Sequence, residues 1–545
     1  MLPTLVAAEV RETLLDYLRT TWALSDGELE RALFAYLQSD RLQGGTGIFQ
    51  GPYVRLRLPF EPASPDAYTG IEHPPGYTPY QHQLTAWQRL STLDGRAPQP
   101  TLVVTGTGSG KTEAFLVPIL DHCLRAKRRG EKGIKAIILY PMNALAADQA
   151  RRVAEMVHGD DESWPMRGKL RVGMYVGGEG KHKVMGPGHV IDDRKQLREN
   201  PPDVLLTNYK MLDFLLLRPS DRRLWEDNAP DTLRYVVLDE LHTYDGAQGT
   251  DVACLVRRLA GRLGGARFCP VGTSATVTSE RGSSQGRLLE FASDIFGVPF
   301  GEDAVVGEKR RSPAAFFSLF GPSSPASLPE DVTPLAPIED DDIDAHVGRV
   351  ASAFFPGDAR LFVDGVVDRA RLGDRIARHP VARELIERGS EAIHTLDELD
   401  AALLERADWR ARSEADRRAL LEGILSMLSW ARREAGGRVA PLLQVQVQVW
   451  VREVRRLVRE VAAEPRFAWR DEQPQAPSGV LQLPMYLCRA CGHSGWMSVL
   501  SELSRELESR VNEVGRAALE RKAELVYLHR DDAVGDETLP GLAAR

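Results

Sequence analysis

A glycine-rich turn at residues 105–112 has the composition of a phosphate-binding loop. It follows the apolar run Thr101–Val104 and reads Thr-Gly-Thr-Gly-Ser-Gly-Lys-Thr. Glycines let backbone N–H groups close around phosphate oxygens, and a helix that begins here adds the positive end of its dipole. Lys111 can then reach the β- and γ-phosphates, while the Thr112 hydroxyl can bind magnesium. The general pattern has Gly at position 105, where this chain has Thr.

Two carboxylates, Asp239 and Glu240, follow the apolar run Leu233–Leu238. Parallel α/β sheets bind ligands where such strands end. Asp239 can hold magnesium, and Glu240 can orient and deprotonate an attacking water. An Asp-Glu pair after a strand is usually a solvated strand end. Because a phosphate-binding loop precedes this pair, the sequence predicts hydrolysis of a nucleoside triphosphate.

The elements that must position these residues are short apolar runs alternating with helical segments. Strands that are apolar throughout and alternate with helices predict a parallel sheet covered on both faces. The fold class expected here is therefore α/β. The expected strands are Thr101–Val104, Ile134–Tyr140, Leu170–Val176, Asp203–Thr207, Leu233–Leu238 and Phe268–Gly272, and the helices between them include Glu113–Lys127, Ala144–Val157 and Asp251–Leu263.

Six segments of the chain, in order, resemble the motifs of DEAD/DEAH-box helicases of superfamily 2. Leu241 departs from the family, which usually has Ala or Val there. The resemblance covers about residues 80–300, a little under half of the chain. The segments are Tyr80–Gln83 (Q motif), the turn with Lys111 (motif I), Tyr140–Leu145 with Gln149 (motif Ia), Leu206–Tyr209 (motif Ib), Asp239–His242 (motif II) and Gly272–Thr276 (motif III).

This resemblance implies a RecA-like P-loop NTPase domain, with ATP and magnesium as cofactors. It implies that Gln83 pairs with adenine, that Tyr80 stacks on the base, and that His242 connects motif II to a second motor domain. The implied sets are Glu240, Lys111, Asp239 and His242 for catalysis; Tyr80, Gln83, Thr107, Gly108, Ser109, Gly110, Lys111 and Thr112 for the nucleotide; Thr112 and Asp239 for magnesium; and Ser274, Ala275 and Thr276 for coupling.

Motifs Ia and Ib, with the turn after Tyr175, imply contacts to one nucleic-acid strand. Backbone N–H groups and small polar side chains contact successive phosphates without identifying bases. The formal net charge of -8 agrees with local contacts rather than bulk attraction. The implied residues are Pro141, Asn143, Ala144, Gly177, Gly178, Thr207 and Asn208.

Residues 239–258 are similar to large bacterial helicases of the YprA/MrfA type, through Thr243-Tyr244, Gly246 and Arg257-Arg258. Those are DNA helicases with repair roles, and related large helicases belong to anti-phage systems such as Druantia and DISARM. The similarity implies single-stranded or partly duplex DNA as substrate, and defence-system proteins as partners. RNA stays open as a substrate, because phosphate contacts alone do not distinguish the sugars.

A helicase motor needs a second RecA-like domain that supplies arginine fingers to the γ-phosphate. No convincing finger motif follows residue 300, and Arg452–Arg459 has the pattern of a charged helix face. We therefore expect the chain to be the N-terminal part of a longer protein, or a partner subunit to supply the second domain. Two other functions stay open: a duplex translocase that feeds a nuclease partner, and a nucleotide-gated scaffold without turnover.

Five cysteines in 545 residues do not form a disulfide framework. Cys123, Cys254 and Cys269 are expected to be buried free thiols. Cys488 and Cys491 have the spacing of half a zinc site, with His493 as a third candidate ligand. The alternative is two reduced thiols in a turn.

The expected organisation has five parts. The N-terminus lacks the features of a secretory signal and no apolar run is long enough to span a membrane, so a cytoplasmic location is expected. The parts are a helical accessory region and linker (1–76), the motor domain (77–300), a linker (301–350), a helical insertion (351–470), and a segment with the Cys pair and one long helix, Ser501–Leu525 (471–545).

Overall fold

The computed structural model divides the chain into two compact units. Unit 1 combines residues 1–59 with 312–545, and unit 2 comprises residues 60–311. Within the described part, no helix is long and apolar enough to cross a membrane. The described residues are 3–39, 46–106, 108–158, 166–178, 180–275, 283–338, 342–435, 438–471, 479–500, 506–520 and 524–528.

Unit 2 is built on a seven-stranded sheet whose neighbouring strands are all parallel, which confirms the predicted α/β fold. Six strands lie in the predicted apolar runs. The seventh, β8, lies in the segment 301–350 that was expected to be a linker, because its two valines continue the sheet beside β2. The strand order is β4 (Val172–Tyr175), β5 (Val204–Asn208), β3 (Ala136–Tyr140), β6 (Tyr235–Leu238), β7 (Cys269–Ser274), β2 (Thr101–Val104) and β8 (Val305–Gly307).

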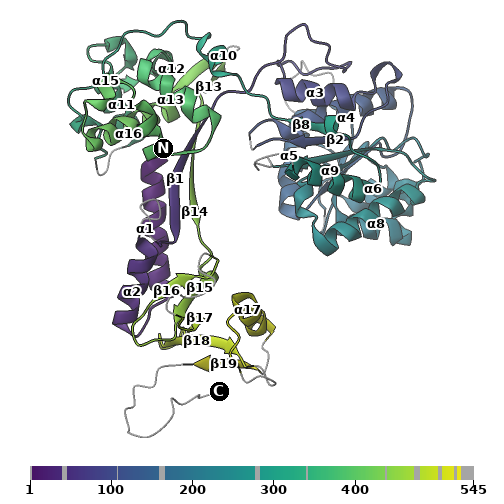
Figure 1. Ribbon diagram of the computed structural model, residues 1–545. Helices are drawn as coiled ribbons and strands as arrows, with labels where there is room; N and C mark the ends of the chain where they lie inside the picture. Colours follow the sequence, from purple (N-terminus) through teal and green to yellow (C-terminus); the bar gives the residue numbers. More distant parts are fainter. Residues whose placement is uncertain are drawn as a thin grey trace. The chain divides into compact units, whose positions relative to one another are not determined.

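Helices cover both faces of this sheet (Figure 1). Side chains alternate across a strand, so Ile137 of β3 lies in one core and Ile138 in the other. The Ile138 side is covered by α3 (Gln81–Leu90), α4 (Lys111–Arg128) and α5 (Asn143–His158), the Ile137 side by α7 (Tyr209–Leu217), α8 (Gly246–Arg262) and α9 (Ser283–Phe296), and α6 (Arg194–Glu199) lies between β4 and β5 in sequence.

The cysteines of this unit differ from expectation at one position. Cys123 and Cys269 are buried as predicted, and burial raises the pKa of both thiols. Cys254 is exposed on α8. The core-facing stripe of that helix passes through Val252 and Val256, and Cys254 lies outside it.

In unit 1 a layer of helices encloses a mainly apolar core around Trp409. Arg417 and the Trp409 indole both donate to Asp400, which connects three consecutive helices. The helices are α10 (Pro313–Phe317), α11 (Ile343–Phe354), α12 (Arg369–Arg378), α13 (Pro380–Glu391), α14 (Leu396–Leu403), α15 (Ala407–Arg410) and α16 (Glu414–Trp430), with a small hairpin of β9 (Phe362–Val363) and β10 (Val366–Val367).

A long antiparallel strand pair runs through unit 1, alongside α1 (Pro3–Thr21) (Figure 1). β1 (Phe49–Arg57) pairs with β14 (Gln444–Val451), from Phe49 opposite Val451 to Arg57 opposite Gln444, and β11 (His394–Thr395) pairs with the other edge of β1. α2 (Gly27–Gln38) begins at Asp26, whose carboxylate accepts two backbone N–H groups.

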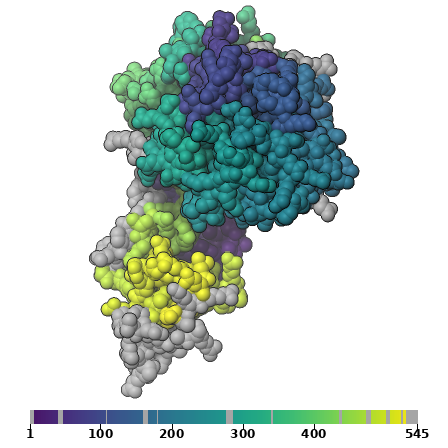
Figure 2. All heavy atoms as spheres, turned by 90° about the vertical axis from the view of Figure 1, so that its right-hand side faces the viewer, coloured from purple at the N-terminus to yellow at the C-terminus, as the bar shows by residue number. Residues whose placement is uncertain are grey.

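The expected helical insertion over 351–470 is helical only as far as Trp430. The alternation of Gln and Val over 444–451 has the period of two of a strand, and β14 forms there. A five-stranded antiparallel sheet follows, in the order β16 (Phe467–Trp469), β15 (Leu457–Glu460), β17 (Gln482–Leu487), β18 (Ser494–Val499) and β19 (Leu525–Leu528), and a hairpin of β12 (Arg432–Ala435) and β13 (Arg438–Pro441) precedes β14. In Figure 2 the residues of this later part of the chain, light green to yellow, are gathered together.

The expected helix Ser501–Leu525 is much shorter in the structure. α17 spans Val511–Glu520, and residues 525–528 form β19. Leu507 pairs with Leu500 in an isolated antiparallel bridge, and the N–H of Glu508 donates to Val499 O. The chain therefore extends beside β18 before the helix can begin.

Candidate nucleotide-binding site

The phosphate-binding loop connects the buried strand β2 to α4, which begins at Lys111. Gly108 and Gly110 have φ of 75° and 74°, in the left-handed region where only glycine is unstrained. A side chain at Gly110 would also collide with the amide of Gln83. Ser109 is buried and its hydroxyl donates to the Thr105 hydroxyl at 2.8 Å. Thr107, predicted to bind the nucleotide, lies outside the described residues.

The structure brings Lys111 and Glu240 together from the ends of two different strands. Lys111 Nζ lies 3.2 Å from Glu240 Oε1, and both side chains are partly accessible to solvent. Glu240 has a φ of 50°, which is unusual for a residue with a side chain. Its backbone N–H donates to the Thr273 hydroxyl at 3.0 Å, which holds this turn in place.

Asp239 is more deeply placed than Glu240 and is only 8% exposed. Burial raises the pKa of its carboxyl group, and the hydroxyl of Thr273, which donates to the carboxylate, acts in the opposite direction. The Thr112 hydroxyl donates to Gln149 Oε1 at 3.3 Å. A carboxylate and a hydroxyl at the end of the phosphate-binding loop are oxygen donors of the kind magnesium prefers.

On the side where the resemblance places the base, Gln83 is already bonded to the protein. Its Oε1 accepts the N–H of Tyr80 at 2.9 Å, and its Nε2 donates to Gly110 O at 3.1 Å. Each group has the capacity for one more hydrogen bond, and the residue is 3% exposed. The Tyr80 ring is 36% exposed and can stack on a base, whereas His82 is buried and bonds Ser109 O at 2.8 Å.

His242 bridges two of the predicted motifs. Its Nδ1 lies 3.1 Å from the hydroxyl of Ser274 and 3.5 Å from Glu240 Oε2. Ala275 follows on the surface, and Thr276 lies outside the described residues. Thr273, which bonds both Asp239 and Glu240, was not among the predicted site residues, although it lies within motif III.

The residues predicted to bind nucleic acid lie where the neighbouring strands β3, β5 and β4 end. The side-chain amide of Asn208 donates to Asn143 Oδ1 at 2.6 Å, and the Thr207 hydroxyl donates to Tyr175 O at 2.5 Å. Gly177 lies close to Asn143. The exposed group consists of Asn143, Ala144, Gly177 and Gly178, with Pro141 partly exposed beside it.

One residue that supports this group was not predicted from the sequence. Arg194 Nη2 donates to Gly178 O at 2.5 Å, and its guanidinium lies over the Tyr175 ring, 5.6 Å from the centroid. Arg194 thus fixes the carbonyl of Gly178 from a distant point in the sequence, and no local pattern identified it.

Cys488 and Cys491 lie in the turn between β17 and β18. The N–H of Cys488 donates to His493 O and the N–H of Gly492 donates to Cys488 O, both at 2.8 Å. Backbone N–H groups of Ala490 and Cys491 lower the pKa of the Cys488 thiol. Within the described ranges, no group of three or more His, Cys, Asp or Glu side chains is arranged to hold a metal.

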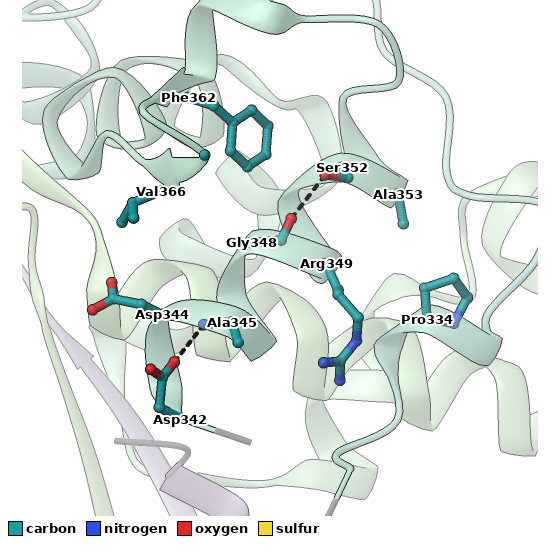
Figure 3. A pocket seen from close by; sticks show the side chains of 11 residues that line it. Pro334, Asp342, Asp344, Ala345, Gly348, Arg349, Ser352, Ala353, Phe362 and Val366 are labelled. Atoms are coloured by element: carbon teal, nitrogen blue, oxygen red, sulfur yellow. Dashed lines mark hydrogen bonds between the residues drawn. The ribbon is translucent and has the colours of Figure 1, made fainter. Parts of the chain in front are cut away.

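An open pocket of about 700 Å³ lies in the helical part of unit 1 (Figure 3). Its polar side chains serve the local structure: Asp342 accepts the N–H of Ala345 and caps α11, and the Ser352 hydroxyl donates to Gly348 O. None of the residues lining this pocket belongs to the predicted motifs.

Residues 80–282 match the family model described as DEAD/DEAH box helicase. The Druantia protein DruE of Escherichia coli is 27% identical over 398 residues, which cover 53% of this chain and 21% of DruE. The uncharacterized ATP-dependent helicase YprA of Bacillus subtilis is 28% identical over 230 residues, covering 41% of this chain and 26% of YprA. The chain thus spans about a fifth to a quarter of the length of these relatives.

Among solved structures, the DUF1998 helicase MrfA bound to DNA is 20% identical with a TM-score of 0.34, covering 50% of this chain and 36% of that chain. The DEAD-box helicase Mss116, bound to single-stranded RNA and UDP-BeF, is 18% identical with a TM-score of 0.31, covering 52% of this chain and 43% of that chain.

Proposed function

Because residues 80–282 belong to the DEAD/DEAH-box helicases of superfamily 2, a family of ATP-dependent motors, we propose that the chain binds and hydrolyses ATP to drive movement along DNA. The observation that carries this proposal is the 3.2 Å contact between Lys111 Nζ and Glu240 Oε1. It places a cation for phosphates and a base for water in one site.

We propose that ATP exchanges the partners of this ion pair. The γ-phosphate takes the ammonium of Lys111, and Glu240 is then available to orient a water molecule and accept its proton. The backbone N–H groups of Gly108 and Gly110 and the dipole of α4 bind the phosphates. The amide of Gln83 uses its remaining hydrogen-bonding capacity on the adenine edge, and Tyr80 stacks on the base.

Thr112 and Asp239 are the residues that would hold magnesium. The hydroxyl and the carboxylate fit this hard cation in donor type. Held by these two side chains, magnesium would supply positive charge that stabilises the phosphates during hydrolysis.

The completed motor requires arginine residues that contact the γ-phosphate from a second RecA-like domain. The described part of unit 1 consists of helices and antiparallel sheets, which supports a source elsewhere in a longer chain or in a partner subunit. His242, which is half exposed beside Ser274, is proposed to contact that domain. Ser274, Ala275 and Thr276 are proposed to couple hydrolysis to strand movement.

The proposed substrate is single-stranded or partly duplex DNA, bound across the ends of β3, β5 and β4. Asn143 and Asn208 would contact successive phosphates, together with the Gly177-Gly178 turn. Thr207, which is buried, would instead hold the end of β5 through its hydrogen bond to Tyr175 O. The choice of DNA rests on the resemblance of residues 239–258 to large bacterial DNA helicases. Similarity to a Druantia protein supports anti-phage defence as the pathway, and DNA repair is the alternative.

Zinc is proposed as a structural ion at Cys488 and Cys491, completed by further ligands. A bound ion would protect both thiols from iodoacetamide, and chelation with EDTA would restore their reactivity. If alkylation is equal before and after chelation and elemental analysis finds no zinc, then Cys488 and Cys491 are two reduced thiols in a turn. The exposed thiol of Cys254 serves as the internal control.

The central experiment measures ATP hydrolysis by the full-length gene product with and without single-stranded DNA, single-stranded RNA and duplex DNA. Stimulation by single-stranded DNA is the expected result. Stimulation by RNA alone would reassign the substrate, and stimulation by duplex without strand separation would make the protein a translocase. Nucleotide binding without any turnover would support the scaffold function.

A further inference from the structure

A side-chain cluster outside the matched region 80–282 contacts the nucleotide site. Its members are Phe60, Glu308 and Arg310, from the two ends of unit 2. Residues 60 and 310 form an isolated antiparallel bridge, and the N–H of Glu61 donates to Lys309 O at 2.9 Å. None of the helicase motifs includes these residues, so the sequence offered no signal for them.

The parallel register places Glu308 beside the phosphate-binding loop. Val104 of β2 is paired with Gly307 of β8, so the next residues of both strands emerge together at the ligand-binding edge. Glu308 Oε2 accepts the backbone N–H of Gly106 at 3.3 Å, and its side chain is only 13% exposed. The carboxylate of Glu308 thus holds the start of the phosphate-binding loop, at Gly106.

Arg310 connects this carboxylate to the base side. Its Nε donates to Glu308 Oε1 at 3.0 Å, and its guanidinium carbon lies 4.0 Å from the centre of the Phe60 ring. The Phe60 ring in turn lies 5.0 Å from Tyr80 and 5.3 Å from His82. A planar guanidinium can pair with a carboxylate and stack on a ring at the same time.

The end of the loop, at Ser109, is held by His82, which contacts the same cluster. His82 is 1% exposed, and burial lowers the pKa of its imidazole, so the neutral ring bonds Ser109 O at 2.8 Å. Tyr80 stacks on His82 at 5.7 Å. The start and the end of the loop are therefore connected through one group of contacting side chains. This group includes the exposed ring of Tyr80, which is proposed to stack on the base.

We propose that Glu308 and Arg310 are positioning residues of the nucleotide site, which set the phosphate-binding loop and the base-stacking ring relative to each other and so contribute to preference for adenine. This inference rests on the proposed nucleotide site. Glu308 acts through Gly106, and Arg310 acts through Glu308 and Phe60.

The test titrates the complete chain with a fluorescent N-methylanthraniloyl ADP and competes it with ADP and GDP. Glu308→Ala should weaken binding on the order of tenfold, the effect of losing one hydrogen bond to a charged group. Glu308→Gln keeps an oxygen acceptor for Gly106 and should stay within about threefold of wild type. Glu302→Ala, an exposed carboxylate nearby, is the control.

Arg310→Met should reduce the preference for ADP over GDP several-fold, because the apolar chain fills the space without fixing the ring stack. A merely structural defect would weaken both nucleotides equally. The inference is overturned if Glu308→Ala binds as tightly as wild type, if Glu308→Gln binds as weakly as Glu308→Ala, or if Arg310→Met leaves the base preference unchanged. A wild-type chain that binds no nucleotide would instead overturn the proposed function.

Discussion

The sheet of unit 2 and the helices of unit 1 place their charged groups in opposite ways. Unit 2 carries buried charges at both ends of its parallel strands. Lys135 and Asp203 pair where strands begin, and Asp239 lies where β6 ends. The described helices of unit 1 bury His346 and His379 but no Asp, Glu, Lys or Arg, and their ion pairs lie largely at the surface. The antiparallel sheet of unit 1 buries one charged pair of neighbours, Arg459 and Glu460. Burying charge costs free energy unless partners are arranged for it. Unit 2 bears that cost at the proposed catalytic end of its sheet as well as at the opposite end, whereas the described helices of unit 1 do not.

The largest effect is expected from Lys111→Ala. Removing the only cation of the phosphate-binding loop in the described structure should weaken ATP binding by more than about 100-fold, because charge pairs of this kind contribute several kcal/mol. Isothermal titration calorimetry with ATP and magnesium measures it. Wild-type affinity in this variant would contradict the assignment of the loop, and Lys127→Ala, on the last turn of the same helix, is the matched control.

Glu240→Gln should separate binding from chemistry. The amide cannot accept a proton, so kcat for ATP hydrolysis should fall about 100-fold or more, while the affinity for ATP stays near wild type. Steady-state kinetics of the full-length protein provide both constants. If kcat is retained, Glu240 is not the base, and the charge at this edge has only a structural role.

Trp409→Ala should lower the stability of unit 1 and leave the nucleotide site of unit 2 unaffected. This ring is fully buried, so its removal should lower the free energy of unfolding by about 3 kcal/mol or more. ATP affinity below the new unfolding midpoint should be unchanged. Thermal unfolding with and without ATP measures both effects, and Trp450→Ala, at 63% exposure, should change stability by less than about 0.5 kcal/mol.

The smallest effect is expected from Asn208→Ser. Serine can still cap α7, as Asn208 does by accepting the N–H of Met211, but it loses the amide that donates to Asn143. Affinity for single-stranded DNA should fall about three- to tenfold, as for one lost hydrogen bond, with ATP affinity unchanged. Fluorescence anisotropy at fixed salt measures it. An unaltered DNA affinity would remove this edge from the proposed DNA path, and Asn200→Ser is the control.

Unit 2 could be predicted from the sequence because the same residues indicate both its strands and its functional site. Each motif follows an apolar strand, so Val104 and Leu238 identify both a strand and the site at its end. β8 was missed because Val305–Gly307 is too short to show a pattern. Glu308 and Arg310 were missed because their role comes from the register between distant strands, which no local spacing encodes.

Unit 1 could be predicted only in part. Its helices were expected from their apolar spacing. Residues 444–451 lie within the segment expected to be helical, although their alternating Gln-Val pattern predicts a strand. Residues 501–525 have helical spacing in the sequence, but the antiparallel bridge between Leu500 and Leu507 places residue 507 beside β18, and α17 begins only at Val511. Such a bridge is a tertiary contact, which local spacing does not encode.

The pairing of β1 with β14 has a consequence for the order of events on the ribosome. Val54 of the first strand meets Val447 of the second, and all of unit 2 is translated between them. At about 5–20 residues per second, β1 would wait roughly 20 to 80 seconds for β14. Unit 2 can complete its sheet during that interval. The N-terminal segment must meanwhile remain extended or be shielded by a chaperone, so nascent-chain proteolysis should find it sensitive until residue 451 has left the exit tunnel.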